Sequence, residues 1–272
     1  MLQIQHLTKR FGDHVAVDDL SLHIAPGEIY GFIGHNGAGK TTTLRSVAGI
    51  QQFDAGEILI GGVSIKTDPL ACKRTMAYIP DNPDLYDYMT GIQFLNLIGG
   101  VSIKADPLAC KRTMAYIPDN PDLYEYMTGI QFLNFIGDVF AVPADVRQSR
   151  IREYAGRFEL TDDLAQPISA YSHGMKQKLA IISAWLHQPR LILMDEPFVG
   201  LDPKASHLLK EMMREVCDEG GAIFFSTHVL EVAEKLCDKV AIIKNGRLIR
   251  SGTMEEVKGD ESLEDVFLEL QE

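Results

Sequence analysis

Short, strongly apolar runs recur along this chain and are separated by stretches with helical spacing, which predicts alternating strands and helices. Three such runs cover residues 28–33 (EIYGFI), 190–195 (RLILMD) and 222–226 (AIFFS). Apolar runs of this length without polar alternation are typical of strands in a parallel sheet that is buried on both faces. The pattern therefore predicts an α/β fold in which helices cover a mostly parallel sheet.

Two stretches have the spacing of amphipathic helices. Residues 40–49 place three apolar side chains on one helical face, namely Leu44, Val47 and Ala48. A second helix is expected after residue 202, because Asp202 can cap its start, Pro203 suits its first turn and Gly220 can end it. The predicted inner stripe of this second helix consists of Leu208, Leu209, Met212 and Val216.

Two hairpins are also visible in the sequence. Residues 58–65 read ILI-GG-VSI, and a later stretch reads VAIIK-NG-RLIRSG. Asn245 and Gly246 in the later stretch suit a two-residue type I′ turn, which requires positive φ at both positions. These hairpins predict antiparallel edges beside the parallel sheet.

A long internal repeat interrupts the alternation. Residues 62–99 and 100–137 differ at only three pairs of positions, which are Thr67/Ala105, Asp87/Glu125 and Leu97/Phe135. Because a solenoid needs about three or more repeats to close a core, two copies do not predict one. The favoured interpretation is a recent duplication, an engineered insertion or an assembly artefact, and a purposeful two-copy function is the alternative.

Composition narrows the class of protein. Hydrophobic residues make up 46% and charged residues 24% of the 272 residues, as in a folded globular protein. A net charge of −12 argues against binding nucleic acid through bulk electrostatics but leaves room for a local phosphate site. Four cysteines are too few for a disulfide framework, which favours a reducing compartment.

No signal peptide is expected at the start, MLQIQHLTKRFG, and no stretch approaches the ~18 apolar residues of a membrane span. A membrane function would thus need another chain to supply the span.

The strongest chemical signal is a phosphate-binding loop. Residues 34–41 read GHNGAGKT, follow an apolar strand and open a helix, which is the context that the pattern G-x-x-x-x-G-K-[ST] requires. Glycines let several backbone N–H groups point at one anion, and the helix adds the positive end of its dipole. Lys40 can reach the β and γ phosphates, and the Thr41 hydroxyl can bind Mg²⁺, whereas His35 is expected to be an outward spacer. The candidate nucleotide-binding residues here are Gly34, His35, Asn36, Gly37, Ala38, Gly39, Lys40, Thr41 and Thr42.

A pair of acidic residues complements this loop. Residues 191–196 read LILMDE, so that Asp195 ends a buried strand and Glu196 follows it. Asp195 is expected to hold Mg²⁺, and Glu196 to polarise the attacking water as general base, an effect worth about 10²–10⁴-fold in rate.

With a third motif the sequence resembles the nucleotide-binding subunit of an ABC transporter. Residues 171–177 (YSHGMKQ) are similar to the family signature LSGGQ-x-Q, which Ser172 and Gly174 match and from which Tyr171, His173 and Met175 depart. Ser172 also suits the N-cap of a helix with Met175, Leu179, Ile182 and Leu186 on one face. The resemblance implies that Ser172, His173, Gly174 and Met175 meet the γ-phosphate of ATP held by another subunit.

Three more elements follow the family pattern. VGLDP at 199–203 looks like the D-loop, which implies that Asp202 reaches across a dimer interface; a plain helix cap is the alternative. His228, after AIFFS, looks like the switch histidine that contacts the γ-phosphate. Phe11 looks like the aromatic residue on which adenine stacks, with a role in the core as the alternative.

The repeat falls on the family's Q-loop, which touches Mg²⁺ or the attacking water and senses the membrane partner. The strand of the form YIPQ occurs here twice as YIPD, so that Asp81 or Asp119 stands in the glutamine position. An ionised aspartate can bind Mg²⁺ but cannot donate a hydrogen bond. The sheet has one place for this strand, and the first copy is favoured because it directly follows the hairpin at 58–65 and emerges first during synthesis.

The resemblance implies a P-loop NTPase (RecA-like) α/β core with an antiparallel β subdomain and an inserted α-helical subdomain. The core is expected at residues 1–90 and 189–272, the surplus copy at 91–127 and the helical signature subdomain at 128–188. Two subunits, identical or paralogous, would enclose ATP and Mg²⁺ head to tail and drive an integral-membrane permease from the cytoplasmic face. The segments YIPDNPDLY and YSHGMKQ are most similar to those of the ABC-2-type export group. No nucleic-acid partner is expected.

Other functions remain open at this point. One is a soluble ABC ATPase acting on ribosomes or DNA, although the single phosphate loop and the acidic chain disfavour it. Another is a nucleotide-binding subunit whose coupling is impaired by the repeat, or a hydrolysis-dead regulator. The transported substrate cannot be read from this chain.

Overall fold

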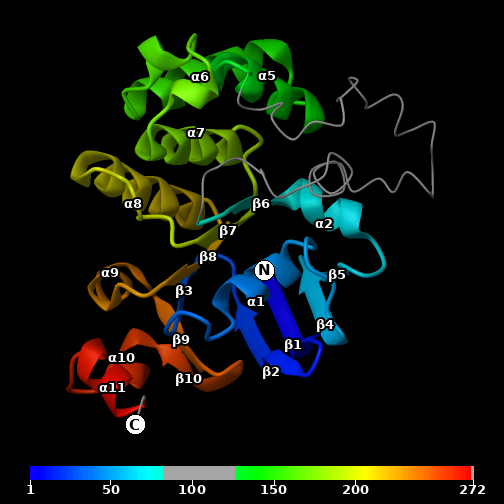
Figure 1. The fold of residues 1–272 in the computed structure, drawn as a ribbon, viewed down its shortest axis with the longest axis vertical. Coiled ribbons are helices and arrows are strands. Elements are labelled where there is room, and N and C mark those ends of the chain that lie inside the picture. Colours follow the sequence, from blue (N-terminus) through cyan, green and yellow to red (C-terminus); the bar gives the residue numbers. More distant parts are fainter. Residues whose placement is uncertain (82–125, 271–272) are drawn as a thin grey trace. The chain divides into compact units, whose positions relative to one another are not determined.

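The computed structural model describes residues 1–81 and 126–270 and divides into two units (Figure 1). The first unit is built from Met1–Asp81, Arg190–Pro197 and Lys210–Glu272. The second is built from Asn82–Pro189 and Phe198–Leu209. The first unit is therefore assembled from segments that are far apart in the sequence.

The first unit contains a six-stranded sheet in the order β10-β9-β3-β8-β7-β6. All neighbours in this sheet are parallel except β10, which is antiparallel to β9. This confirms the mostly parallel sheet with an antiparallel edge that the apolar runs predicted. The strands are β3 (Ile29–Ile33), β6 (Met76–Ile79), β7 (Leu191–Asp195), β8 (Ala222–Thr227), β9 (Lys239–Lys244) and β10 (Arg247–Thr253).

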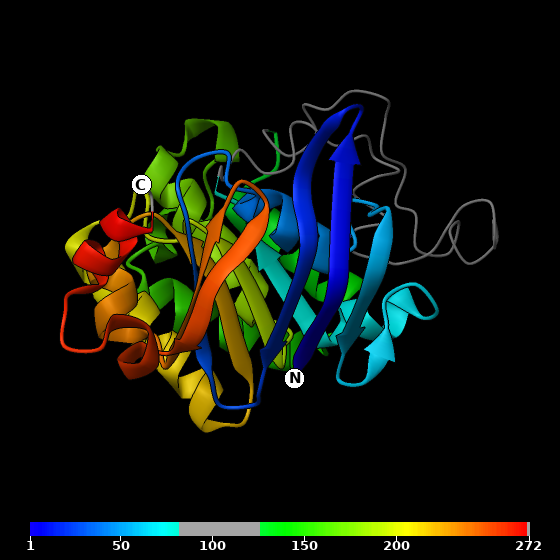
Figure 2. The same ribbon diagram turned by 90° about the horizontal axis from the view of Figure 1, so that it is seen from below.

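A second sheet of the same unit is antiparallel and has the order β2-β1-β4-β5; its dark-blue strands β1 and β2 run side by side in Figure 2. The β4–β5 hairpin was predicted, but the β1–β2 hairpin was not. The missed signal is a period of two, because Leu20, Leu22 and Ile24 alternate with exposed residues. The strands are β1 (Leu2–Phe11), β2 (His14–Ile24), β4 (Ala55–Ile60) and β5 (Val63–Ser64).

Both predicted hairpin turns form as expected. Gly61 and Gly62 have φ of 59° and 85°, and Asn245 and Gly246 have φ of 51° and 79°. Positive φ at both central residues matches the right-handed twist of the flanking strands. The turn at 245–246 connects β9 to β10 and returns the chain along the edge of the six-stranded sheet.

Three helices of the first unit connect these strands, and two follow the last strand, β10. They are α1 (Lys40–Val47), α2 (Pro69–Thr75), α9 (Leu230–Leu236), α10 (Met254–Lys258) and α11 (Leu263–Glu269). In α1 the predicted inner residues Leu44 and Val47 are fully buried, and Ala48 at its C-cap is 1% exposed. In the part of the chain that the structure describes, no helix combines the length and apolar character needed to cross a membrane.

In its described residues, 126–189, the second unit contains three longer helices and two short 3₁₀ turns. The α5 helix begins with a capping box, in which Thr128 Oγ1 accepts from the Gln131 N–H and Gln131 Oε1 accepts from the Thr128 N–H. In α7, Leu179 and Ile182 are buried as predicted, whereas Met175 is half-buried. The elements are α5 (Gly129–Val139), α6 (Ala144–Arg157), η2 (Thr161–Asp163), η3 (Ile168–Ala170) and α7 (His173–Trp185).

The α8 helix (Pro203–Asp218) forms where the sequence predicted it, but its inner face is centred differently. Leu209 and Met212 are fully buried, whereas Leu208 and Val216 are half-buried. The remaining buried positions are Ala205, Met213 and Cys217. Because 3.6 residues make a turn, a stripe through 205, 209, 212–213 and 217 is the predicted face rotated by about one position. The prediction that Leu208 and Val216 lie on the inner face was therefore wrong.

Aromatic packing stabilises the core of the first unit. The Phe224 side chain of β8 is fully buried, with its ring centroid 5.3 Å from that of Phe32 and 6.0 Å from that of Tyr30. Tilted and edge-on contacts of this kind add to the stabilisation from burial.

We expect Phe224→Ala to lower the free energy of unfolding by about 3–5 kcal/mol, because it removes a buried ring and leaves a cavity. Urea titration followed by circular dichroism measures this change. The control is Ile249→Ala on β10, where the side chain is 42% exposed and the expected change is within about 0.5 kcal/mol. Equal losses in the two variants would contradict the role assigned to this core.

Candidate functional site

Residues 34–39 of the phosphate loop lie between β3 and α1, and residues 40–41 begin the helix. Two of the loop's glycines are required by close backbone approaches. A Cβ on Gly34 would lie 2.7 Å from the Ile243 carbonyl oxygen. A Cβ on Gly39 would lie 2.4 Å from the Ala16 carbonyl oxygen, and Gly39 also has φ of 106°, where other residues are strained. The loop therefore has a fixed path that only glycine permits at these two positions.

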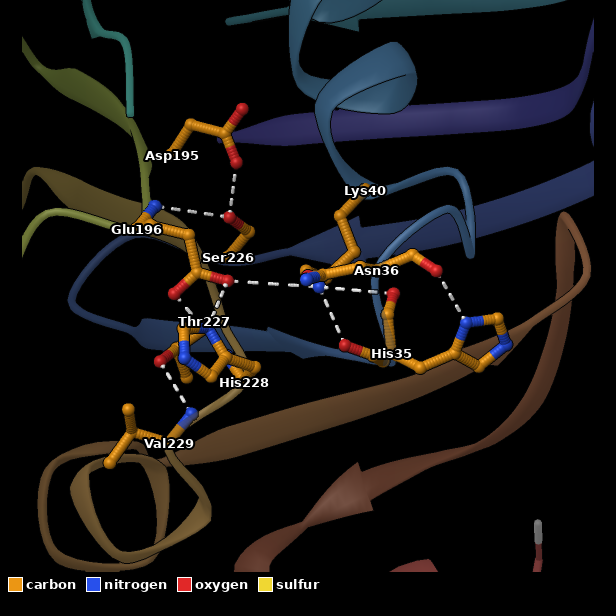
Figure 3. Close-up of polar contacts among 10 residues, drawn as sticks. His35, Asn36, Lys40, Asp195, Glu196, Ser226, Thr227, His228 and Val229 are labelled. Atoms are coloured by element: carbon orange, nitrogen blue, oxygen red, sulfur yellow. Dashed lines mark hydrogen bonds and ion pairs between the residues drawn. The ribbon is translucent and has the colours of Figure 1, made fainter. Parts of the chain in front are cut away.

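The α1 helix starts at Lys40 with no side-chain cap on its first N–H groups. Uncapped N–H groups and the helix dipole favour an anion at this end. Asn36 is exposed and His35 is half-buried, with its Nδ1 2.7 Å from the Asn36 carbonyl oxygen (Figure 3). Ala38 is fully buried, so this residue can contribute its backbone alone.

Lys40 is a buried cation at the start of the helix, and its side chain turns back toward the loop. Its Nζ donates to the Gly34 carbonyl at 2.5 Å and to the His35 carbonyl at 3.3 Å, and lies 3.7 Å from Glu196 Oε1 (Figure 3). Burial lowers the pKa of Lys40, and the nearby carboxylates of Glu196 and Asp195 oppose this shift. The ammonium group is thus held among oxygen acceptors at the mouth of the loop.

Asp195 ends β7 and is 1% exposed. Its Oδ1 accepts a hydrogen bond from the Ser226 hydroxyl, whereas its Oδ2 is buried with no hydrogen-bond partner among the described residues. Burial raises the pKa of Asp195, and the hydroxyls of Ser226 and Thr41 act in the opposite direction. A buried carboxylate oxygen without a donor is a good ligand for a cation.

Glu196 follows directly and is held from two sides. Its backbone N–H donates to the Ser226 carbonyl and hydroxyl, both at 3.2 Å, and its φ of 47° lies in the left-handed region. Its Oε1 lies 2.9 Å from His228 Nδ1, and its Oε2 accepts from the His228 N–H at 3.3 Å (Figure 3). Strained backbone of this kind is often found at functional sites. Glu196, His228 and Lys40 therefore converge on one place.

Lys40, Asp195 and Glu196 border a cavity of about 300 Å³, and His228 reaches it only through its contact with Glu196. Phe11 lines it with 48% of its surface exposed, so the alternative of a core role for Phe11 is excluded. His14 and Ala16 line the same cavity and were missed in the sequence, because the β2 strand that carries them was not predicted. The described residues that line it are Phe11, His14, Ala16, His35, Asn36, Gly37, Gly39, Lys40, Thr41, Thr42, Asp81, Asp195 and Glu196.

Asp81 belongs to this cavity, and Asp119 does not lie in the described part of the chain. The strand beside β7 is β6, which comes from the first copy of the repeat, as favoured above. Asp81 follows this strand, is exposed and borders the cavity together with Asp195.

The remaining candidates belong to the second unit. Ser172 caps α7 as predicted, because its Oγ accepts from the Met175 N–H at 3.3 Å. A Cβ on Gly200 would lie 2.3 Å from the His173 ring, and one on Gly174 would lie 2.8 Å from the Gly200 carbonyl oxygen. The signature segment is therefore closely packed against the loop that precedes α8.

Asp202 forms the cap that the sequence predicted for α8. Its Oδ1 accepts from the Ala205 N–H at 2.8 Å, and its Oδ2 lies 2.8 Å from Lys178 Nζ. The Lys178 ammonium, together with the Ala205 N–H, lowers the pKa of Asp202. Asp202 thus connects α7 to the start of α8.

Taken together, the first unit offers backbone N–H groups and a cation for phosphates, oxygen ligands for a divalent cation and a carboxylate next to a histidine. Such a set suits phosphoryl transfer, in which positioning and charge stabilisation dominate.

Comparison with known proteins agrees with this chemistry. The family model described as ABC transporter matches residues 17–199. The ABC-type transporter ATP-binding protein EcsA of Bacillus subtilis (strain 168) is 30% identical over 99% of this chain and 96% of its own length. The Nod factor export ATP-binding protein I of Ralstonia nicotianae is 31% identical over 94% of this chain and 68% of its own length. A solved ATP binding subunit of an ABC transporter superposes with a TM-score of 0.80 at 28% identity, and the alignment covers 100% of both chains.

The buried carboxylate predicts a pH dependence of stability. Because burial raises the pKa of Asp195 in the folded state, its contribution to stability is full below the unfolded pKa of about 3.9 and is lost as the pH rises. Asp195→Asn keeps an acceptor for Ser226 and carries no charge. With a chelator present and no nucleotide, we expect this variant to have a higher free energy of unfolding than the wild type at pH 7. The difference in free energy should shrink toward pH 4.

Asp202→Asn serves as the control of opposite sign. The pKa of Asp202 is lowered, so its contribution is present at pH 7 and is lost as the pH falls through the folded pKa. This variant should be less stable than the wild type at pH 7 and equal to it in acid. Urea midpoints between pH 4 and pH 7 measure both trends, and a pH-independent difference for Asp195→Asn would contradict the first.

Proposed function

The chain belongs to the ABC transporter family as an ATP-binding subunit with ATPase activity, and on that premise we propose that it uses Mg-ATP to power a separate integral-membrane permease. The observation that carries the proposal is the convergence of Lys40, Glu196 and His228 beside the phosphate loop. Each of these groups has a distinct task in hydrolysis.

The proposed tasks follow from charge and reach. Lys40, with the N–H groups at the start of α1, neutralises the β and γ phosphates. Glu196 accepts the proton of the attacking water, since its carboxylate is fixed at the edge of the cavity. His228 lies 2.9 Å from Glu196 and is 53% exposed at the side chain, which lets it orient the base and donate to the γ-phosphate.

The oxygen groups at this site fit Mg²⁺. Mg²⁺ prefers carboxylate and hydroxyl oxygens and takes its other ligands from water and phosphates. Asp195 offers a buried oxygen without a donor, and Thr41 and Asp81 border the same cavity. When bound, Mg²⁺ supplies positive charge that offsets the charge on the phosphate oxygens. We propose that Thr41 and Asp195 hold it, and that Asp81 takes the place of the family's glutamine.

Phe11 is proposed to stack on adenine. Its exposed ring borders the cavity, and Lys9 Nζ lies over the ring, 5.0 Å from its centroid. Aromatic faces stack on any base without reading its identity. The specificity for adenine would therefore come from other contacts.

A second copy of this chain, or a paralogous subunit, is proposed to complete each ATP site head to tail. Ser172, His173, Gly174 and Met175 would supply the start of α7 to the γ-phosphate, and Asp202 would lie at the interface. Met175 stands in place of the signature glutamine, so this contact depends on backbone N–H groups and the Ser172 hydroxyl. The permease would hold the pair at the cytoplasmic face of the membrane.

Export is the proposed direction of transport. This proposal is supported by the sequences around YIPD and YSHGM and by the similarity to the Nod factor export protein. The permease would select the cargo, as the family resemblance implies.

Glu196→Gln tests the proposed function. Loss of the base should slow hydrolysis about 10²–10⁴-fold while ATP still binds, so the ATP-bound pair accumulates. Light scattering with and without Mg-ATP should show a shift from monomer to dimer. The control is Glu196→Gln combined with Lys40→Ala, which should not bind ATP and should remain monomeric.

Two outcomes would count against the proposal. A Glu196→Gln chain that hydrolyses ATP at the wild-type rate would exclude Glu196 as the base. A chain that binds ATP and stays monomeric at all concentrations would exclude the head-to-tail pair of identical subunits.

The repeat yields a separate prediction. Excision of residues 82–119 joins Asp81 directly to Asn120. Asn120 is the counterpart of Asn82 in the second copy, so the local sequence after Asp81 is kept, and β6 is untouched. We expect the ATP turnover of the isolated subunit to stay within about twofold, since no residue with a proposed task in hydrolysis other than Asp119 is removed. A larger loss, measured by phosphate release, would show that the surplus copy contributes to the site.

A further inference from the structure

The β9–β10 turn contacts the phosphate loop through the backbone of Ala38 and Gly39. The Gly246 N–H donates to the Ala38 carbonyl at 2.9 Å, and Gly246 is buried although its neighbour Asn245 is exposed. Ile243, at the end of β9, packs under the same loop, since its carbonyl oxygen would be 2.7 Å from a Cβ on Gly34. The C-terminal hairpin therefore contacts the phosphate loop at two places.

The turn is also fixed to β2. The Asp18 N–H donates to the Gly246 carbonyl at 2.9 Å. Arg247 Nε donates to Asp18 Oδ2 at 2.8 Å, and Arg247 Nη2 lies 2.7 Å from the same oxygen. A Cβ on Gly246 would lie 2.9 Å from the Ala16 carbonyl oxygen, so the turn closely approaches the strand that lines the cavity.

These contacts have a directional consequence for the loop. In a trans peptide the C=O of one residue and the N–H of the next point in opposite directions. Because the Gly246 N–H binds the Ala38 carbonyl and the Ala38–Gly39 peptide is trans, the N–H of Gly39 points away from the β9–β10 turn. Gly39 itself borders the cavity, next to Lys40 and Thr41.

We propose that Gly246 is a positioning residue for phosphate binding, which presets the Ala38–Gly39 peptide through its N–H and is itself held by the Arg247–Asp18 pair. The inference rests on the proposed nucleotide site and assigns a task to the β9–β10 turn. It concerns ground-state binding of phosphates, so it predicts a change in affinity and KM, with little change in kcat.

Gly246→Ala tests this with a matched control. Both Gly246 and Gly61 have positive φ in a two-residue hairpin turn, but a Cβ on Gly61 meets nothing within 4 Å. Each alanine strains its turn, and only the one at 246 must displace the turn from Ala16 and the loop. By calorimetry and steady-state kinetics, Gly246→Ala should raise the Kd for ATP and ADP and the KM for ATP about tenfold, the equivalent of one hydrogen bond. Its kcat should stay within about twofold, and Gly61→Ala should leave all these constants within about twofold.

The ion pair supplies an independent test that avoids backbone strain. Arg247→Gln and Asp18→Asn should each weaken ATP binding about threefold, and the exchanged pair Asp18→Arg/Arg247→Asp should recover part of the loss. Amide hydrogen exchange of the wild type adds a readout that needs no variant. Because coupling is reciprocal, ADP should increase the protection of the Gly246 amide but not that of Gly61.

Three results would overturn the inference: equal Kd changes for Gly246→Ala and Gly61→Ala, affinity changes that merely follow the loss of thermal stability, or no protection of Gly246 by ADP. These results are distinct from failure of the proposed function, which would appear as a wild-type chain that binds no ATP.

Discussion

The structure depends on one constraint, which is that three apolar strands lie fully buried side by side in parallel. The β3, β7 and β8 strands have no exposed position, and their register aligns Asp195 with Ser226 and Ile33 with Thr227. Because parallel strands end at the same edge of a sheet, the polar residues that follow them meet there. The burial of the strands offsets the cost of placing a carboxylate such as Asp195 beneath the surface.

Most polar groups at this edge contact one another, although Asp195 Oδ2 has no hydrogen-bond partner among the described residues. Lys40 lies 3.7 Å from Glu196, which is longer than a hydrogen bond, and His228 stays half exposed while it faces the same carboxylate. The Lys40–Glu196 contact is therefore weak compared with a charge-assisted hydrogen bond to a phosphate oxygen. Side chains can therefore turn toward a nucleotide while the strands that carry them keep their places.

The sequence predicted those parts of the fold whose signals are local. The run EIYGFI followed by GHNGAGKT specified a strand, a loop and a helix, and the Asn245-Gly246 turn and the Ser172 cap were each visible in a few residues. The comparisons confirmed the family on which the remaining assignments depend. Asp119, the second candidate for the glutamine position, lies outside the described residues.

Other features have local patterns that are interrupted or ambiguous. The β1–β2 hairpin was missed because its register shifts at several points, and His6 and Asp19 have positive φ where the alternation is broken. His14 and Ala16 became site residues when this hairpin formed beside the loop. The inner face of α8 was placed one position away, because several apolar residues at neighbouring positions allow more than one stripe.

The order of strands in the six-stranded sheet also constrains how the protein is made. The strand that carries the phosphate loop, β3, is among the first to be synthesised, but its two neighbours, β8 and β9, belong to the last quarter of the chain. An entirely apolar strand must therefore wait on the ribosome without partners while most of the protein is translated, which is the situation in which nascent chains need chaperones. A polypeptide that ends before β9 would lack one wall of the loop and would be a substrate for proteolysis, so the nucleotide site can mature only when synthesis is nearly complete.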